Sequence, residues 1–226
     1  MIDKVVASVA EALAGIGDGA TVLLGGFAGV GEPRALIEGL VETGVKDLTI
    51  VSNTTGRAAS GLGRLVSLRR VRRIICSFSR RGSAPDFQAQ LVAGEIELEM
   101  CPQGTLAERL RAAGAGIPAF YTPAAVGTLL AAGKEHREFG GRTHVLEPAI
   151  YGDVALVEAW EADRWGNLTF RSTGRNFNPV MATAARLTIA QAQHVRPLGE
   201  IDPEMIATPG LFVHRVVHVP CGDPPA

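Results

Sequence analysis

The sequence predicts an α/β layer structure on a mainly parallel sheet, with β-rich elaboration in its last third. Two observations support this prediction. Over the first two thirds, short apolar runs alternate with longer stretches of helical periodicity, and helices between buried strands favour parallel pairing of those strands. After Gly140 the pattern changes to a series of strand-like runs.

The elements of the first two thirds follow in order. Residues 2–16 repeat apolar side chains at helical spacing and end in glycines, which predicts a helix. This segment has no basic region before an apolar core, so we expect no signal peptide. Strands are expected at 21–24, 48–52, 73–77, 96–100 and 118–121. Helices are expected at 33–43, 84–93 and 105–113.

The last third reads as strands joined by turns. A turn signal, RWGN, begins at Arg164 between two of the strand-like runs. The runs are 143–147, 153–160, 167–170, 186–191 and 211–219. We expect residues 1–220 to form a single domain and residues 221–226 to form a flexible tail.

Composition excludes several classes of protein. The 226 residues carry a net charge of −1, so neither nucleic acid nor a membrane surface is an expected partner. The longest uncharged stretch, residues 112–133, contains two prolines and several glycines and is not expected to span a bilayer. The three cysteines are far apart and form no CxxC pair, which indicates a cytoplasmic protein without disulfides or a metal site.

The stretch DGATVLLGGFAGVGEP, residues 18–33, is the most informative local pattern. Its four glycines, at 25, 26, 29 and 31, lie between an expected strand and an expected helix, where open α/β sheets bind ligands. Missing Cβ atoms allow close backbone approach to an anion or a polar ligand. The order of glycines matches neither the dinucleotide fingerprint nor the Walker A motif. A ligand loop is favoured, and a tight structural turn stays open.

The same stretch resembles the signature of the A-type subunit of the family I coenzyme A transferases, the 3-oxoacid CoA-transferases. Three further blocks resemble that family in collinear order, CPQGTLAERLRAAGAGIPAFYTP (101–123), NFNPVMATAA (176–185) and GEIDPEMIATPGLFVHRVV (199–217). The resemblance implies the three-layer α/β fold of the CoA-transferase superfamily. It also implies that the loop binds CoA, which is a substrate here and not a permanently bound cofactor. The implied CoA-binding residues are Gly25, Gly26, Phe27, Ala28, Gly29, Val30 and Gly31. Replacing Gly29 or Gly31 by Val should then weaken CoA binding and leave the fold largely intact.

CoA transfer needs a carboxylate nucleophile and donors aimed at an oxyanion. By the residues alone, Gln103 is best explained as a cap of the helix expected from Thr105. The resemblance instead places the oxyanion-hole glutamine of the family at Gln103. The alternating Glu95, Glu97 and Glu99 are interpreted as the solvated face of a strand.

The nucleophile is expected on another polypeptide. In the resembled family the catalytic glutamate lies in a Ser/Gly-Glu-Asn-Gly motif of the second, B-type subunit, and no Glu-Asn-Gly occurs in this chain. The resemblance therefore implies half of an enzyme, active only with the B-type CoA-transferase subunit in a heterodimer or an A2B2 heterotetramer. Asn53 matches a family asparagine near the acyl site, although an Asn that begins a turn is an equal alternative. Many members of the family have a second asparagine directly after the first, where this chain has Thr54. This difference leaves open which acyl group the enzyme prefers.

The implied reaction transfers CoA from a donor such as succinyl-CoA to a 3-oxoacid. The chain looks closest to 3-oxoadipate CoA-transferase subunits, and acetoacetate is the alternative acceptor. A sugar-phosphate-binding protein or isomerase on the same fold is a more remote alternative. Seven arginines between Arg64 and Arg81 suggest a nucleic-acid-binding module, a solvated or subunit surface, or contact with CoA phosphates. The surface interpretation is favoured because the segment has no interleaved aromatic platform and the whole chain is slightly acidic.

Overall fold

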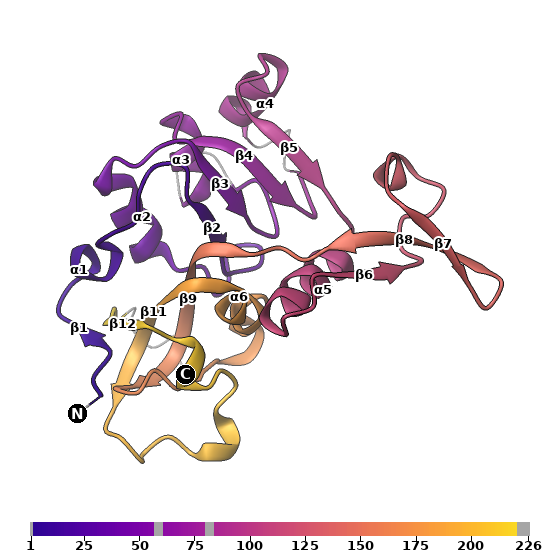
Figure 1. Cartoon of the computed structure of the whole chain (residues 1–226). Helices are drawn as coiled ribbons and strands as arrows, with labels where there is room; N and C mark the ends of the chain where they lie inside the picture. The colour runs from indigo at the N-terminus through magenta and orange to yellow at the C-terminus, as the bar shows by residue number, and fades with distance from the viewer. Residues whose placement is uncertain (1, 57–60, 80–83, 221–226) are drawn as a thin grey trace.

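The computed structural model describes residues 2–56, 61–79 and 84–220. Within those ranges one large sheet has nine strands in the order β1-β12-β11-β9-β2-β3-β4-β5, with β10 attached to β9 (Figure 1). Neighbours along this path pair in parallel, whereas β10 is antiparallel to β9. The strands are β1 (Val5–Val6), β2 (Thr21–Leu24), β3 (Leu48–Val51), β4 (Val71–Cys76), β5 (Glu97–Met100), β9 (Gly152–Asp163), β10 (Leu168–Thr169), β11 (Ala185–Arg196) and β12 (Arg215–His218).

Helices cover both faces of this sheet, which gives the expected three layers. Along β2, Val22 and Leu24 join one apolar core while Leu23 joins the other, because successive strand side chains point to opposite faces. The first core is closed by α1 (Val9–Leu13), α2 (Arg34–Thr43), α3 (Leu62–Ser67) and α4 (Pro85–Val92). The second is closed by α5 (Gln103–Gly114) and α6 (Asn178–Thr183).

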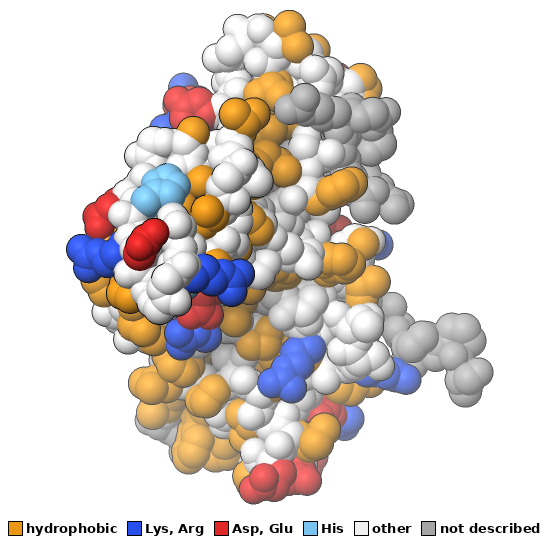
Figure 2. Space-filling model, turned by 90° about the vertical axis from the view of Figure 1, so that its right-hand side faces the viewer, with side chains coloured by type: hydrophobic (Ala, Val, Ile, Leu, Met, Phe, Trp, Pro, Cys, Tyr) orange, Lys and Arg blue, Asp and Glu red, His pale blue; other side chains and the backbone are white. Residues whose placement is uncertain are grey.

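A second, antiparallel sheet projects from the main body (Figure 1). Its strands are β6 (Ala119–Thr122), β7 (His136–Phe139) and β8 (Arg142–Pro148), in the order β6-β8-β7. The short 3-10 helix η2 (Leu129–Ala131) lies between β6 and β7. We call residues 119–148 the arm. On the face of the molecule from which the arm projects, charged side chains lie among exposed hydrophobic ones (Figure 2). The exposed hydrophobic residues of the arm include Leu129 and Phe139.

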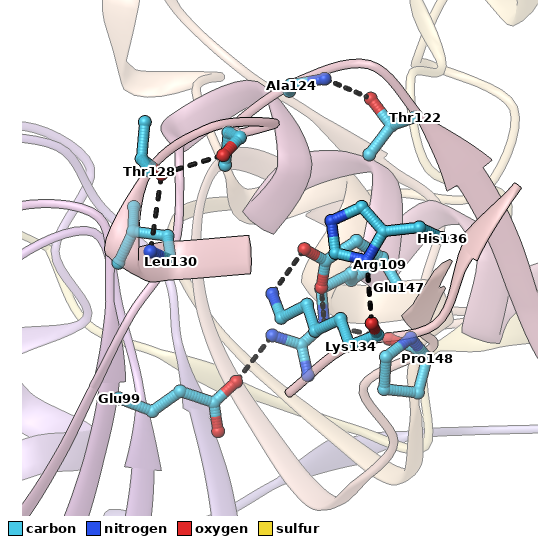
Figure 3. A network of polar contacts seen from close by, with 11 residues as sticks. Glu99, Arg109, Thr122, Ala124, Thr128, Leu130, Lys134, His136, Glu147 and Pro148 are labelled. Atoms are coloured by element: carbon cyan, nitrogen blue, oxygen red, sulfur yellow. Dashed lines mark hydrogen bonds and ion pairs between the residues drawn. The ribbon is translucent and has the colours of Figure 1, made fainter. Parts of the chain in front are cut away.

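Buried charges fasten the arm to the main body (Figure 3). Arg109 of α5 donates to Glu99 Oε1 at 2.6 Å and to the carbonyl of Pro148 at 2.7 Å. Its Nε also lies 3.9 Å from Glu147, which is 1% exposed and pairs with Lys134. Burial raises the pKa of Glu99, but the guanidinium groups of Arg109 and Arg73 together outweigh burial and hold that pKa below its usual value. Arg109 therefore links the arm to the middle of α5 and to β5.

Several local predictions differ from the structure. Residues 2–16 are not one helix, because Val5 and Val6 pair with Val216 and Val217 of β12 and α1 begins only at Val9. The run 211–219 begins as a 3-10 turn and is a strand only in β12. The expected strand near 118–121 is β6, which belongs to the arm and not to the parallel sheet. Helices α3 and α6 and strand β7 were not predicted.

The glutamates at 95, 97 and 99 are only partly a solvated face. Glu95 and Glu97 are exposed, and Glu95 lies before β5 begins. Glu99 is half-buried and holds both Arg73 and Arg109, so its side chain is structural.

Among the described residues, none of the helices is both long and apolar enough to cross a membrane.

Candidate active site

The glycine loop after β2 is a two-residue hairpin. Phe27 and Val30 exchange both backbone hydrogen bonds, at 3.0 and 2.9 Å. Ala28 and Gly29 form the turn with φ of 53° and 91°, the left-handed values of a type I′ turn. Phe27 and Val30 are 44% and 47% exposed, so the tip presents two apolar side chains to solvent. We call residues 25–31 the glycine hairpin.

Gly25 and Gly31 make room for the protein's own asparagines. A Cβ at Gly25 would lie 1.8 Å from Asn178 Oδ1. A Cβ at Gly31, whose φ is 65°, would lie 2.4 Å from the carbonyl oxygen of Gly174. The expectation that Gly31→Val leaves the fold intact is therefore wrong, because a larger side chain meets rigid backbone there.

The other two glycines differ from each other. Gly26 has a φ of 109° and packs against the backbone of Glu32, 3.0 Å from an added Cβ. Gly29 is open, with only the Arg34 guanidinium within 4 Å of an added Cβ, at 3.7 Å. Three of the four glycines thus serve internal packing, and Gly29 is the one whose surroundings leave space for a ligand.

The hairpin borders a cavity at the carboxyl ends of β2 and β3. Asn53 and Thr54 follow β3 and face the hairpin across this cavity. The cavity is lined by Leu24, Gly25, Gly26, Phe27, Ala28, Gly29, Glu32, Ser52, Asn53, Thr54, Gly56 and Leu62. Most of the predicted CoA-binding loop and the predicted acyl-site asparagine thus line one hollow, although Val30 and Gly31 are not among the described residues that line it.

Gln103 lies directly against Asn53. Its Nε2 donates to Asn53 Oδ1 at 2.7 Å, and Ser77 Oγ donates to the same oxygen at 2.9 Å. Gln103 is the first residue of α5 and caps nothing, because Pro102 occupies the N-cap position without a side-chain hydrogen bond. The alternative in which Gln103 caps the helix is therefore wrong. The turn alternative for Asn53 also loses support, since the hydroxyl of Thr54 accepts the N–H of Gly56.

An apolar groove adjoins the cavity on the other side of Phe27. It is lined by Phe27, Gln103, Gly104, Ala107, Asn176, Phe177 and Val180. Gln103 stands at the border, with its amide bonded to a cavity residue and its side chain lining the groove. The first N–H groups of α5 are free of intrahelical partners and add donors at this border.

The other candidates are accounted for by contacts within the chain. His214, just before β12, accepts the N–H of Thr188 on its Nδ1 at 3.0 Å. No group of three metal-binding side chains occurs in the ranges that the structure describes. Arg80 and Arg81 lie outside those ranges. The remaining arginines of that segment each contact an acidic side chain or a backbone carbonyl, namely Arg64, Arg69, Arg70, Arg72 and Arg73. These contacts favour the surface interpretation.

Comparison with known proteins agrees with the site. The profile of the coenzyme A transferase family matches residues 6–219. The chain belongs to the coenzyme A transferase family. The A-type subunit of the 3-oxoadipate CoA-transferase of Pseudomonas putida is 52% identical over 219 residues, covering 97% of this chain and 95% of that protein. The A-type subunit of the probable succinyl-CoA:3-ketoacid coenzyme A transferase of Mycobacterium tuberculosis is 52% identical over 237 residues, with coverage of 97% and 95%.

Solved structures of CoA-transferases share the fold. An acyl-CoA transferase from E. coli O157:H7, in a thioester complex with CoA, matches with a TM-score of 0.84 at 25% identity, covering 98% of this chain and 48% of that one. Glutaconate coenzyme A-transferase from Acidaminococcus fermentans gives a TM-score of 0.85 at 22% identity, covering 96% of this chain and 76% of that one. The predicted fold class, family and CoA-transferase activity are confirmed.

Sequence reasoning missed three residues that build the site. Ser77 orients Asn53, and Asn176 and Asn178 bond to the hairpin. The two asparagines lie in the block NFNPVMATAA, which carried the family resemblance without an assigned role. That match was the only available signal, since nothing in their local pattern indicates a contact with residues about 150 positions earlier.

Proposed function

We propose that this chain is the A-type half of a 3-oxoacid CoA-transferase. It moves CoA from a donor such as succinyl-CoA to 3-oxoadipate, with acetoacetate as the second candidate acceptor. The observation that carries the proposal is the contact between Gln103 and Asn53 at the edge of the hairpin-lined cavity. Membership of the coenzyme A transferase family favours this reaction over sugar-phosphate chemistry.

Gln103 is the proposed oxyanion donor. Its Nε2 carries two hydrogens, and only one is engaged by Asn53. The second is available to the oxygen of a thioester carbonyl as that oxygen becomes negative in the tetrahedral intermediate. Asn53, fixed by Ser77, holds the Gln103 amide in the orientation that presents this hydrogen. The donor is therefore oriented before reaction, which is the condition for effective electrostatic catalysis.

The covalent steps need a carboxylate that we assign to the B-type subunit. A glutamate carboxylate attacks the acyl carbon of the donor, and the CoA thiolate leaves to give a mixed anhydride. The thiolate then attacks the glutamyl carbonyl, which releases the donor acid and forms the enzyme–CoA thioester. The acceptor acid reverses both steps and leaves as its CoA thioester. Glu32 lines the cavity but lies 3.7 Å from Arg34 at the entry to α2, and we assign it no covalent role.

The B-type subunit is the proposed partner on the edge that carries the site. The exposed Phe27 and Val30 and the apolar groove lie together there, and apolar surface of this kind is typical of obligate interfaces. A heterodimer or an A2B2 heterotetramer fits this arrangement. Cys76 and Cys101 are both buried free thiols, which supports the proposed cytoplasmic location.

Acceptor preference is measured on the purified complex of the two subunit types. With succinyl-CoA as donor, kcat/KM should be higher for 3-oxoadipate than for acetoacetate. A higher kcat/KM for acetoacetate would make acetoacetate the acceptor, while the proposed type of reaction would stand. Turnover with neither acid would overturn the proposed function.

A further inference from the structure

The side-chain amide of Asn176, which lies outside the glycine hairpin, bridges the two strands of the hairpin. Asn176 Oδ1 accepts the N–H of Gly26 at 3.1 Å, and Asn176 Nδ2 donates to the carbonyl of Val30 at 3.0 Å. One side chain therefore replaces the backbone bonds that a longer hairpin would make below its turn. The same Nδ2 donates to the carbonyl of Thr173 at 2.8 Å, which fixes the amide in place.

A second asparagine anchors the end of the hairpin to the main sheet. Asn178 is fully buried, and its Nδ2 donates to the carbonyls of Gly31 and Gly174 at 3.0 and 2.8 Å. Its Oδ1 accepts the N–H of Glu158 in β9 at 3.1 Å. The buried amide is thus satisfied on both its nitrogen and its oxygen, and it links three segments.

The residue between these asparagines belongs to the other half of the site. Phe177 lines the apolar groove together with Gln103 and Val180, and Asn176 lines it too. The segment 176–178 therefore contacts the hairpin through its asparagines and lines the same groove as Gln103 through Phe177. Any movement of this segment changes the spacing between the loop and the candidate oxyanion donor.

We propose that Asn176 and Asn178 are positioning residues, which fix the glycine hairpin relative to Gln103. This inference rests on the proposed function, because the proposed function makes the hairpin part of the CoA-binding site. Asn178 is the structural anchor, and Asn176 orders the part of the hairpin that lines the cavity. Asn176 is half-buried, so water can replace its bonds when they are lost, and the hairpin then loses order without the chain unfolding.

The expected effect is on ligand binding. Without the Asn176 amide, the bound ligand must order the hairpin. The entropic cost of this ordering weakens ligand binding. Two hydrogen bonds of ordinary strength correspond to about a ten-fold change in KM. Since Gln103 and Asn53 are untouched, kcat should stay within about two-fold, which is the pattern of a lost uniform binding interaction.

The test compares three variants in the complex with the B-type subunit. Asn176→Ala removes both bonds to the hairpin. Asn176→Asp keeps an acceptor for Gly26 and loses the donor to Val30, so it should recover part of the lost KM. Asn167→Ala is the matched control, because Asn167 is also half-buried and its amide makes two comparable bonds, to Asp163 and to the N–H of Gly210, each at 2.8 Å. Asn167 lines neither the cavity nor the groove.

Support requires a rise in the KM for succinyl-CoA of about ten-fold in Asn176→Ala, with Asn167→Ala changing only the melting temperature. An unchanged KM in Asn176→Ala, or an equal rise in Asn167→Ala, would overturn the proposal. Hydrogen exchange of the peptide spanning the hairpin gives a readout without turnover, and Asn176→Ala should accelerate it. Unchanged exchange would also overturn the positioning role, whereas an inactive parental complex would count against the proposed function alone.

Discussion

Replacing Gly31 by Ala should destabilise the chain more than the same change at Gly29. Both residues have left-handed backbone angles, with φ of 65° and 91°. For any residue with a Cβ this conformation costs about 1–2 kcal/mol. Only Gly31 adds a contact, because its Cβ would lie 2.4 Å from the carbonyl oxygen of Gly174. Gly29 meets nothing closer than 3.7 Å.

The contact between the added Cβ at Gly31 and the carbonyl oxygen of Gly174 determines how much the two variants differ in stability. Forcing a methyl into a packed site costs about 1–3 kcal/mol, so Gly31→Ala should lose about 2–5 kcal/mol and Gly29→Ala about 1–2 kcal/mol. For a chain of this length 1 kcal/mol shifts the melting temperature by about 2–4 °C. The contact alone should therefore separate the two variants by about 2–12 °C. Thermal unfolding followed by circular dichroism measures this, and an equal or smaller loss for Gly31→Ala would refute the packing account of the hairpin.

Three further predictions concern other parts of the molecule. Gln103→Ala should lower kcat of the complex by about 10²–10³ with little change in KM, and steady-state kinetics would refute the oxyanion role if kcat were normal. Arg109→Met should cost about 1.5–3 kcal/mol in urea unfolding, because it removes the charged donor to Glu99 and to the carbonyl of Pro148; a loss below about 1 kcal/mol would contradict this. Burial, aided by two nearby cationic groups, lowers the pKa of His214, whose Nδ1 accepts the N–H of Thr188. The unfolded chain then binds the proton more readily, so stability should fall as pH drops below about 6.5, and His214→Asn should remove that slope in thermal unfolding at pH 5 to 7.

Much of the fold was predictable because its signals are local. The apolar runs that became β2 and β3, and the helical pattern that became α2, were placed within a residue or two. The missed elements owe their structure to distant partners. Strand β1 has only two residues and exists because it pairs with β12 at the other end of the chain. Helix α6 contains Asn178 and a proline at its start, and it is stabilised by burial against α5 and β9.

The site was predictable in its parts and not in its connections. Resemblance to the family singled out Asn53 and Gln103 separately, but it did not indicate that these residues, 50 positions apart, contact each other directly. The glycines were interpreted as space for a ligand, whereas Gly25 accommodates Asn178 and Gly31 packs against the carbonyl of Gly174. A sequence shows that a Cβ is absent, but it does not show which atom occupies the space.

We propose that this chain supplies the oxyanion donor and the hairpin, while its partner supplies the nucleophile. The most direct measurement locates the covalent intermediate. The complex is incubated with succinyl-CoA, quenched, treated with hydroxylamine and digested, and the modified glutamate is identified by mass spectrometry. We expect the modification on the B-type subunit and no turnover by this chain alone. A trapped glutamate in this chain, or turnover by this chain alone at a rate typical of enzymes, would contradict it.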